Sequence, residues 1–139
     1  MAQLKREGHH DFMLDDSGLF VPSLNGFPGV YSAYVMRTIG CQGMLRLIEG
    51  LDRAARFECC IGVCSDRFGE FTVTGVSRGR IIGEERGHAG FGYDPIFSPD
   101  GAETTFAEMD LEMKNERSHR GRAMRELVAE LGRRMEGRR

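Results

Sequence analysis

An apolar run in the middle of the chain is the feature that most constrains the fold. Residues 55–65 have the length and composition of a mostly buried β-strand. In residues 71–76, apolar side chains alternate with Thr72 and Thr74, which predicts a second strand with two different faces. Residues 80–83 are positioned to extend this hairpin-rich sheet. A β-sheet is therefore expected at the centre of the chain.

Helices are predicted on both sides of these strands. Residues 1–8 fit the last turns of a helix that ends at Gly8, and 38–51 carry apolar residues at mixed helical spacings. Asp110 can cap a short helix that runs to about Glu116. Ser118 can cap a final helix, whose expected apolar stripe is Met124, Leu127, Val128, Leu131 and Met135.

Strands in the middle and helices at the flanks predict an α/β protein with a mixed sheet. The 139 residues fit a single domain, 1–139, with a composition typical of globular proteins. The net charge of −2 gives no electrostatic reason to expect a nucleic-acid or membrane partner. With no apolar run of about 18 residues and no signal-peptide core, a cytoplasmic protein is predicted.

Four cysteines are present, and three of them, Cys59, Cys60 and Cys64, lie in the apolar run. Their spacing does not match the pairs that bind zinc. We therefore expect all three, and Cys41, to be buried thiols that behave as small hydrophobic side chains.

Three segments carry polar side chains that suit a ligand. The first is Asp15-Asp16-Ser17-Gly18, predicted as a turn after the short strand 12–14. Adjacent carboxylates there can hold Mg²⁺, while Ser17 can donate to a phosphate. A plain turn with Asx hydrogen bonds explains the same residues.

The second segment, residues 87–95, is rich in glycine with aromatic residues interleaved. Phe91 or Tyr93 can stack on a base. A tight loop whose aromatic rings pack into the core is the alternative.

The third segment is 114–120, which places His119 and Arg120 in the first turn of the final helix. Cations there oppose the helix dipole, so they suit an acceptor-rich ligand better than a purely structural role. Surface charges without a ligand are the alternative.

Taken together and in order, five motifs resemble the inosine triphosphate pyrophosphatase family, over roughly residues 4–131. They are Asp15-Asp16-Ser17-Gly18-Leu19, residues 25–32 (Asn-Gly-Phe-Pro-Gly-Val-Tyr-Ser), residues 90–97 (Gly-Phe-Gly-Tyr-Asp-Pro-Ile-Phe), residues 105–109 (Thr-Phe-Ala-Glu-Met), and Lys114 with Ser118-His119-Arg120. The loop 24–29 looks most like that of archaeal members.

The resemblance implies an elongated mixed β-sheet flanked by helices, with a central nucleotide-binding cleft, in a homodimer. It implies Mg²⁺-dependent hydrolysis of ITP, dITP or XTP to the monophosphate and pyrophosphate. Asp16 would be the general base and, with Asp15, a metal ligand. The substrate would be bound by Ser17, by the base loop Phe91, Gly92, Tyr93 and Asp94, and by Lys114, His119 and Arg120. All of these are expected to face one cleft.

Donors such as His119 and Arg120 would accept the 6-keto group of hypoxanthine or xanthine and reject the amino group of adenine. Guanine must be rejected at its 2-position, by Asp94 or a neighbouring backbone group.

The family's N-terminal strand, its Ser/Thr-x-Asn-x-x-Lys phosphate loop and an upstream metal glutamate have no matching residues before Asp15. A weak catalyst that still binds the base, with lower Mg²⁺ affinity and an exposed sheet edge, is therefore expected. Three hypotheses remain. The chain is a working pyrophosphatase whose start was defined too late, a relative that binds nucleotides or dimerises with little turnover, or an unrelated Mg²⁺-dependent phosphohydrolase that shares only Asp15-Asp16.

Overall fold

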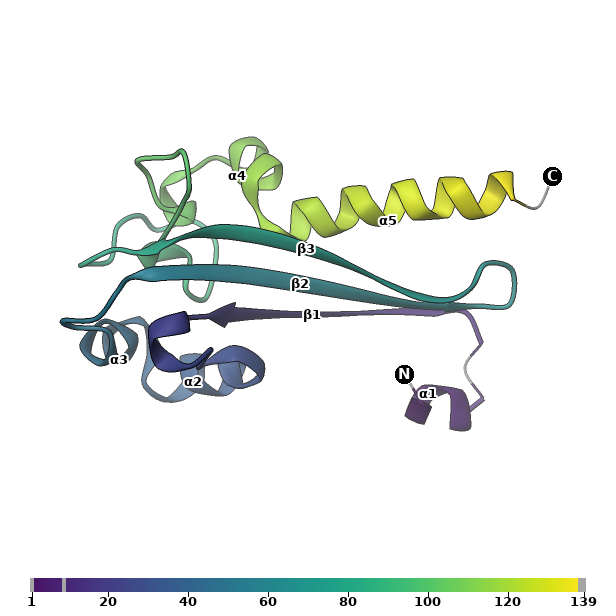
Figure 1. Ribbon diagram of the computed structural model, residues 1–139, viewed down its shortest axis with the longest axis horizontal. Coiled ribbons are helices and arrows are strands. Elements are labelled where there is room, and N and C mark those ends of the chain that lie inside the picture. Colours follow the sequence, from purple (N-terminus) through teal and green to yellow (C-terminus); the bar gives the residue numbers. More distant parts are fainter. Residues whose placement is uncertain (1, 9, 138–139) are drawn as a thin grey trace.

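A four-stranded antiparallel sheet forms the centre of the computed structural model, which describes residues 2–8 and 10–137 (Figure 1). The strands follow the order β1-β2-β3-β4. They are β1 (Phe12–Phe20), β2 (Ala54–Ser65), β3 (Gly69–Ile81) and β4 (Phe97–Pro99). The predicted α/β class and the elongated sheet are confirmed, although the described strands are all antiparallel rather than mixed, because each is joined to the next by an antiparallel pairing.

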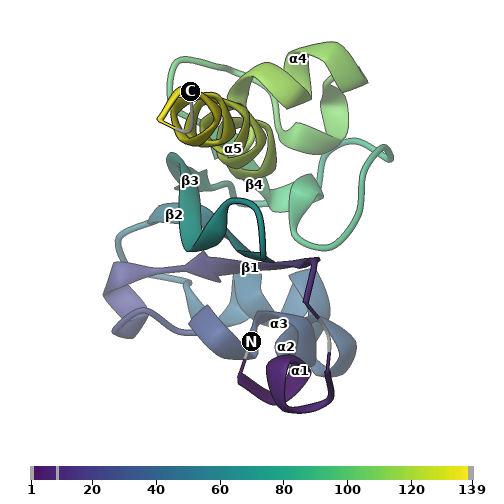
Figure 2. The same ribbon diagram turned by 90° about the vertical axis from the view of Figure 1, so that its right-hand side faces the viewer.

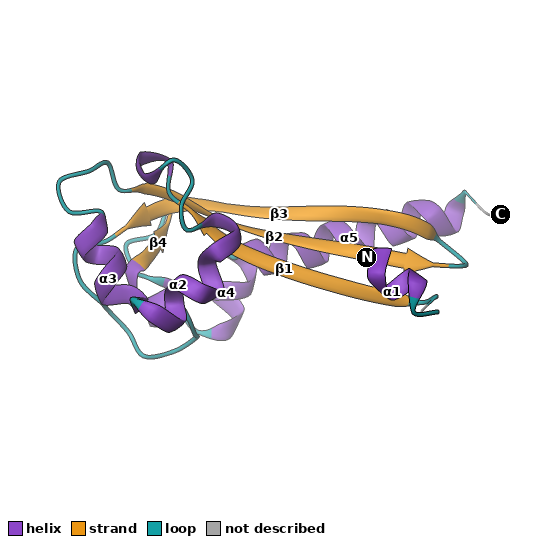
Figure 3. Cartoon of the chain, turned by 90° about the horizontal axis from the view of Figure 1, so that it is seen from below, coloured by secondary structure: helices purple, strands orange, loops and turns teal. Residues whose placement is uncertain are grey.

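The described residues form five α-helices that flank the sheet. They are α1 (Ala2–Arg6), α2 (Ser32–Thr38), α3 (Gly40–Leu47), α4 (Leu111–Arg117) and α5 (His119–Glu136). Short 3₁₀ turns occupy Pro22–Leu24, Gly29–Tyr31, Asp94–Ile96 and Phe106–Glu108. Helices α2, α3 and α4 gather at one end of the strands, and α5 runs along them (Figure 3). None of the helices described has the length and apolar character needed to cross a bilayer.

Strand β1 corrects the prediction of a turn at residues 15–18. The strand continues without interruption from Phe12 to Phe20 and pairs with β2 over its whole length. The twelve residues of β2 supply a long ladder of backbone partners. That ladder outweighs the turn preference of Asp, Ser and Gly, because strand propensity depends strongly on the neighbouring strand.

The β2–β3 hairpin confirms both predicted central strands. Along β2, buried side chains alternate with more exposed ones. The odd-numbered residues of β2 are buried: Ala55, Phe57, Cys59, Ile61 and Val63. Their neighbours on the other face of the sheet include Cys60, which is exposed, and Cys64, which is half-buried. The prediction of buried thiols is thus confirmed for Cys41 and Cys59 and wrong for Cys60 and Cys64, because successive strand residues point to opposite faces.

Helices α2 and α3 replace the single helix predicted at 38–51. The chain breaks at Gly40, whose φ of +63° suits glycine far better than other residues. Helix α2 was missed because most of its side chains are exposed, so that only Ser32 and Val35 are buried.

The two helix caps predicted near the C-terminus are confirmed. The Asp110 side chain accepts a hydrogen bond from the Met113 amide, and Ser118 accepts one from the Gly121 amide. The predicted apolar stripe of α5 is only partly right. Leu127 is buried and Leu131 packs against the core, whereas Met124, Val128 and Met135 are exposed. The stripe is shifted because Ala123 packs directly on the backbone of β3 at Gly75.

Two clusters of buried hydrophobic side chains among the described residues include residues of the sheet. The larger one lies among α2, α3 and the loops around β4, and includes Leu19, Met44, Phe57, Phe97 and Phe106. The smaller one lies between α5 and the far half of the β2–β3 hairpin, and comprises Cys59, Ile61, Val63, Val73, Ala123 and Leu127. At the far end, the Arg134 guanidinium of α5 donates to the Phe68 carbonyl at the hairpin tip (2.7 Å).

Candidate functional site

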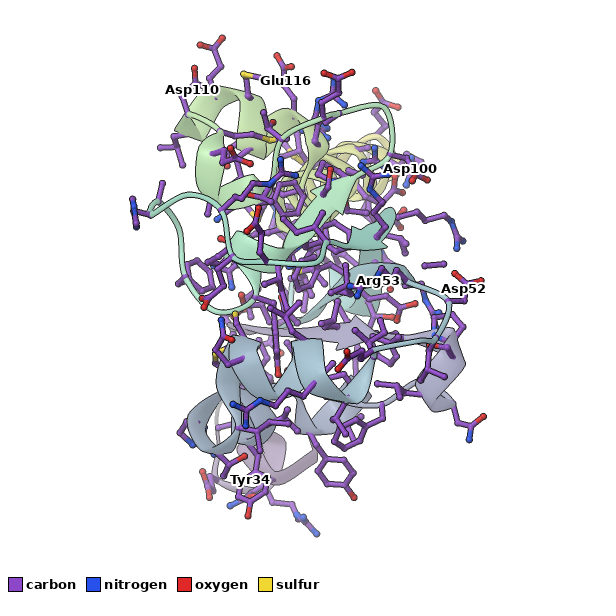
Figure 4. All side chains as sticks on the ribbon, turned by 90° about the vertical axis from the view of Figure 1, so that its left-hand side faces the viewer. Tyr34, Asp52, Arg53, Asp100, Asp110 and Glu116 are labelled. Atoms are coloured by element: carbon purple, nitrogen blue, oxygen red, sulfur yellow. The ribbon has the colours of Figure 1, made fainter. Side chains whose placement is uncertain are left out.

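A pocket of about 500 Å³ lies at the end of the sheet where the helices gather. Its walls come from β1, α2, the loop 91–94, α4 and the start of α5. Viewed along the strands, α2 and α3 lie beside β1 while α4 and α5 lie beside β3 (Figure 2). From the opposite end, Tyr34 of α2 lies at one edge of the view, and Asp110, which caps α4, and Glu116 of α4 lie at the other (Figure 4). The pocket lining combines residues that are far apart in sequence, from Ser17 to Arg120.

A buried ion pair fixes one wall. The Lys114 ammonium of α4 lies 2.6 Å from an Asp94 carboxylate oxygen, and the two side chains are 17% and 5% exposed. The same oxygen accepts a hydrogen bond from the Phe91 amide (3.1 Å). Asp94 therefore folds the glycine-rich loop back on itself and holds Lys114 in the pocket.

The Phe91 ring stands at the mouth of the pocket and is 71% exposed. The Lys114 ammonium lies 4.8 Å from its centroid, and the Arg120 guanidinium lies 6.0 Å from it. Phe91 also contributes to the pocket lining, together with these two cations. An exposed ring between two cations offers a stacking surface for a flat ligand.

His119 lies deeper, stacked on Phe57 with ring centroids 4.7 Å apart and an interplanar angle of 18°. Burial lowers the pKa of its imidazole to about 4, with smaller contributions from the nearby cations Arg120 and Lys114. The ring is therefore neutral at pH 7. Its Nδ1 atom is buried and has no hydrogen-bond partner among the described residues. An unpartnered polar atom of this kind is costly unless a ligand satisfies it.

We expect stability to fall on acidification because of His119. Its folded pKa of about 4 lies below the ordinary value of 6.5, so the unfolded chain takes up the proton first as the pH falls. The stabilisation is complete above pH 6.5 and is lost as the pH falls through 4. The shift corresponds to at most about 3 kcal/mol. Urea unfolding at several pH values checks this, and the pH dependence should flatten in a His119→Gln variant. An unchanged slope in that variant would contradict it.

Arg120 connects the start of α5 to strand β1. Its guanidinium lies 3.0 Å from a carboxylate oxygen of Asp15, with both side chains 52% exposed. Asp15 thus faces the pocket side of β1, and its carboxylate is engaged by a cation.

The pocket also brings in Ser17 but not Asp16. Ser17 pairs with buried Cys59, whereas Asp16 pairs with exposed Cys60. Paired residues share a face of the sheet, so the Asp16 side chain lies on the face opposite Ser17 and His119. Neither Asp15 nor Asp16 contributes to the pocket lining. Asp15 is linked to the pocket only through its ion pair with Arg120, which does line it.

The predicted Mg²⁺ ligands do not form a site in this arrangement. Asp15 and Asp16 point to opposite faces of β1, and Asp15 is already paired with Arg120. Across residues 2–8 and 10–137, no group of three or more His, Cys, Asp or Glu side chains is placed to hold a metal ion. The donor set therefore does not fit a resident Mg²⁺, which prefers several oxygen ligands.

Tyr93 and Gly92 hold the loop to α2 and α3. The Tyr93 hydroxyl donates to the Ser32 carbonyl (2.7 Å), and burial, together with the nearby Cys41, raises its pKa to about 12. The Cys41 thiol donates to the Gly92 carbonyl (3.4 Å). Burial, with Glu85 and Asp94 nearby, raises the pKa of that thiol to about 11, so it stays protonated. These two residues position the loop through the core.

Sequence reasoning missed several lining residues. Phe57 was assigned only to the core, although its ring supports His119. Ala33, Met36 and Arg37 line the opposite wall. Their spacing of three and four residues marks one helix face, a signal that was available once α2 was recognised.

Fold and pocket together define an α/β protein with a pocket that carries an exposed aromatic ring, two cations and an imidazole nitrogen without a partner among the described residues. The model of the Ham1 family matches residues 1–130, and the chain belongs to this family. The resemblance noted from the five motifs is thereby confirmed.

Curated relatives and solved structures support the same family assignment. The chain is 55% identical over 126 residues to the dITP/XTP pyrophosphatase of Pyrococcus horikoshii, covering 90% of this chain and 67% of the relative. It is 52% identical over 113 residues to that of Methanopyrus kandleri, covering 81% and 60%. The Staphylococcus aureus Ham1 protein superposes with a TM-score of 0.84 at 33% identity, covering 96% of this chain and 71% of that one. The chain therefore spans about two thirds of the length of these relatives.

Proposed function

We propose that this chain binds non-standard purine nucleoside triphosphates (ITP, dITP and XTP) and hydrolyses them to the monophosphate and pyrophosphate. Family membership and the names of the archaeal relatives support the substrate class. The single observation that carries the proposal is the unpartnered Nδ1 of neutral His119, buried in a pocket between Phe57 and the cations Lys114 and Arg120.

This donor set suits a 6-keto purine. In the tautomer that carries a proton on Nδ1, His119 donates to the keto oxygen, and Arg120 supplies a second donor. Adenine presents an amino group at the same position, which would leave both donors unpaired. A site built around such hydrogen bonds discriminates strongly against a base that cannot accept them.

In the proposed reaction, water attacks the α-phosphorus. The bond from this phosphorus to the oxygen that bridges it to the β-phosphate breaks, and pyrophosphate leaves. Asp16 is the proposed general base that takes the proton of the attacking water. Because its side chain lies on the face of β1 opposite the pocket here, this role requires the α-phosphate to reach that face or β1 to reorient when the nucleotide binds. We also propose that Mg²⁺ is needed, arriving as the complex with the triphosphate.

The test is pyrophosphate release by the 139-residue chain from ITP, dITP, XTP, GTP and ATP in the presence of MgCl₂. We expect release from the first three to exceed release from ATP, and to stop in excess EDTA or in an Asp16→Asn variant that still binds ITP. Equal rates on ITP and ATP would refute the specificity. Full activity in EDTA would refute the metal requirement.

Nucleotide binding without turnover is the second candidate. It is favoured by the position of Asp16 on the face of β1 opposite the pocket. In that case calorimetry would show tighter binding of ITP than of ATP, while no pyrophosphate would be released.

The Arg120→Ala variant tests how the base is read. We expect kcat/KM for ITP, or the affinity for ITP if turnover is absent, to fall about ten- to a hundredfold, because a charged donor to a buried acceptor contributes about 1.5–3 kcal/mol. The value for ATP should change far less. Equal losses on both nucleotides would mean that Arg120 supports the phosphates, or the fold through Asp15.

We further propose that the chain forms a homodimer. Val30, Tyr31 and Tyr34 are 84%, 62% and 61% exposed on α2 and the turn before it. Tyr34 projects outward from the molecule (Figure 4). Clusters of exposed apolar side chains mark interaction surfaces. Sedimentation of the chain at several concentrations tests this.

A further inference from the structure

The wall of the pocket formed by α2 carries Arg37, whose positive charge is not paired with any acidic side chain that the structure describes. Ala33, Met36 and Arg37 present one face of α2 to the pocket. Arg37 makes no hydrogen bond or ion pair with any residue that the structure describes. Nothing in the sequence motifs pointed to this residue.

The other two cations of the pocket are engaged. Lys114 is held by Asp94 at 2.6 Å, and Arg120 is held by Asp15 at 3.0 Å. Each of these pairs is close to neutral, so Arg37 contributes the uncompensated positive charge of the pocket lining. It lies on the α2 wall, whereas the other two cations come from α4 and α5.

We propose that Arg37 binds the phosphates of the nucleotide, while the base occupies the part of the pocket near Phe91 and His119. The inference rests on the proposed function, because it assigns the two ends of the same ligand to two walls of one pocket. The planar guanidinium matches phosphate oxygens with two parallel hydrogen bonds, and an anion is the partner that an unpaired pocket cation lacks.

A structural role is the alternative. Arg37 lies in the last turn of α2, where a cation stabilises the negative end of the helix dipole. That role predicts a loss of stability without any dependence on the number of phosphates in the ligand. The two roles therefore differ in a measurable way.

The experiment compares the affinities of inosine, IMP and ITP by calorimetry at fixed ionic strength, in the original chain and in Arg37→Gln. We expect the affinity for ITP to fall about ten- to a hundredfold and that for IMP to fall less. The affinity for inosine should stay within about twofold, because the base contacts are untouched. Arg37→Lys should retain part of the ITP affinity, and thermal unfolding shows whether each variant is folded.

Arg46→Gln is the matched control, because Arg46 lies in the last turn of α3 and does not line the pocket. It should leave all three affinities unchanged. Equal losses on inosine and ITP in Arg37→Gln, or no loss on either, would overturn the role of Arg37 while leaving the proposed function standing. Failure of the original chain to prefer ITP over ATP would instead overturn the proposed function, and the phosphate role of Arg37 with it.

Discussion

Replacing Asp94 by asparagine should lower the free energy of unfolding by about 3 kcal/mol and remove most of the affinity for purines. Asp94 is 5% exposed and forms an ion pair with Lys114, which is 17% exposed. Removing one partner of a buried pair leaves the other charge without compensation, which is far more costly than the loss of a surface pair. Asparagine keeps the shape and can still accept from the Phe91 amide, so the measured loss reports the charge.

Urea unfolding and ITP calorimetry of Asp94→Asn measure both effects. Asp110→Asn is the matched control, because it makes the same chemical change at an exposed helix cap where asparagine serves as well as aspartate. It should change stability by less than about 0.5 kcal/mol. The double variant Asp94→Asn with Lys114→Met should recover part of the stability. If the double variant is no more stable than Asp94→Asn, the cost does not come from the unpaired Lys114.

Replacing Gly75 by alanine should displace the start of α5 and weaken ITP binding more than tenfold. A Cβ atom on Gly75 would collide with the His119 carbonyl and the Ala123 amide nitrogen, which are backbone atoms that cannot rotate away. Inserting atoms into such a contact costs about 1–3 kcal/mol. Because His119 and Arg120 begin α5, a shift of the helix moves these two side chains, which are the proposed contacts to the base, away from Phe91.

Gly132→Ala is the control for Gly75→Ala. It also adds one methyl group to a glycine, but on α5 at a position with no neighbouring atom within 4 Å. Alanine favours the helix interior by about 0.5–1 kcal/mol over glycine, so this variant should be more stable and bind ITP normally. Thermal unfolding and calorimetry compare the two. Wild-type affinity in Gly75→Ala would mean that the contact between α5 and β3 does not position the site.

The fold was most predictable where local signals and tertiary structure agree. Asp110 and Ser118 cap the helices that they were expected to cap, and the central hairpin follows its alternating pattern. Helix α2 was missed because its side chains are mostly exposed and give little hydrophobic periodicity. The continuation of β1 through residues 15–18 depends on β2, which lies far along the chain, so local propensity could not show it.

Most of the predicted site residues line the pocket, but the sequence did not predict how all of their side chains are oriented. Phe91, Lys114, His119 and Arg120 all reach the pocket. Asp15 and Asp16 do not line it, because in a strand these adjacent side chains point to opposite faces, whereas the prediction was of a turn. Arg37 could not be recognised from spacing alone, since its significance lies in the absence of a partner among the described residues.

The long β2–β3 hairpin also places its tip far from the pocket. The tip at residues 66–68 lies at the opposite end of β2 and β3 from the helices α2, α3 and α4 that surround the pocket (Figure 3). At that point the Arg134 guanidinium of α5 donates to the Phe68 carbonyl, beyond the smaller hydrophobic cluster. A peptide tag inserted between Asp66 and Arg67 would therefore anchor the molecule to a sensor surface with its pocket open to the solution. Such an orientation would leave the proposed nucleotide site accessible to ligands added in solution.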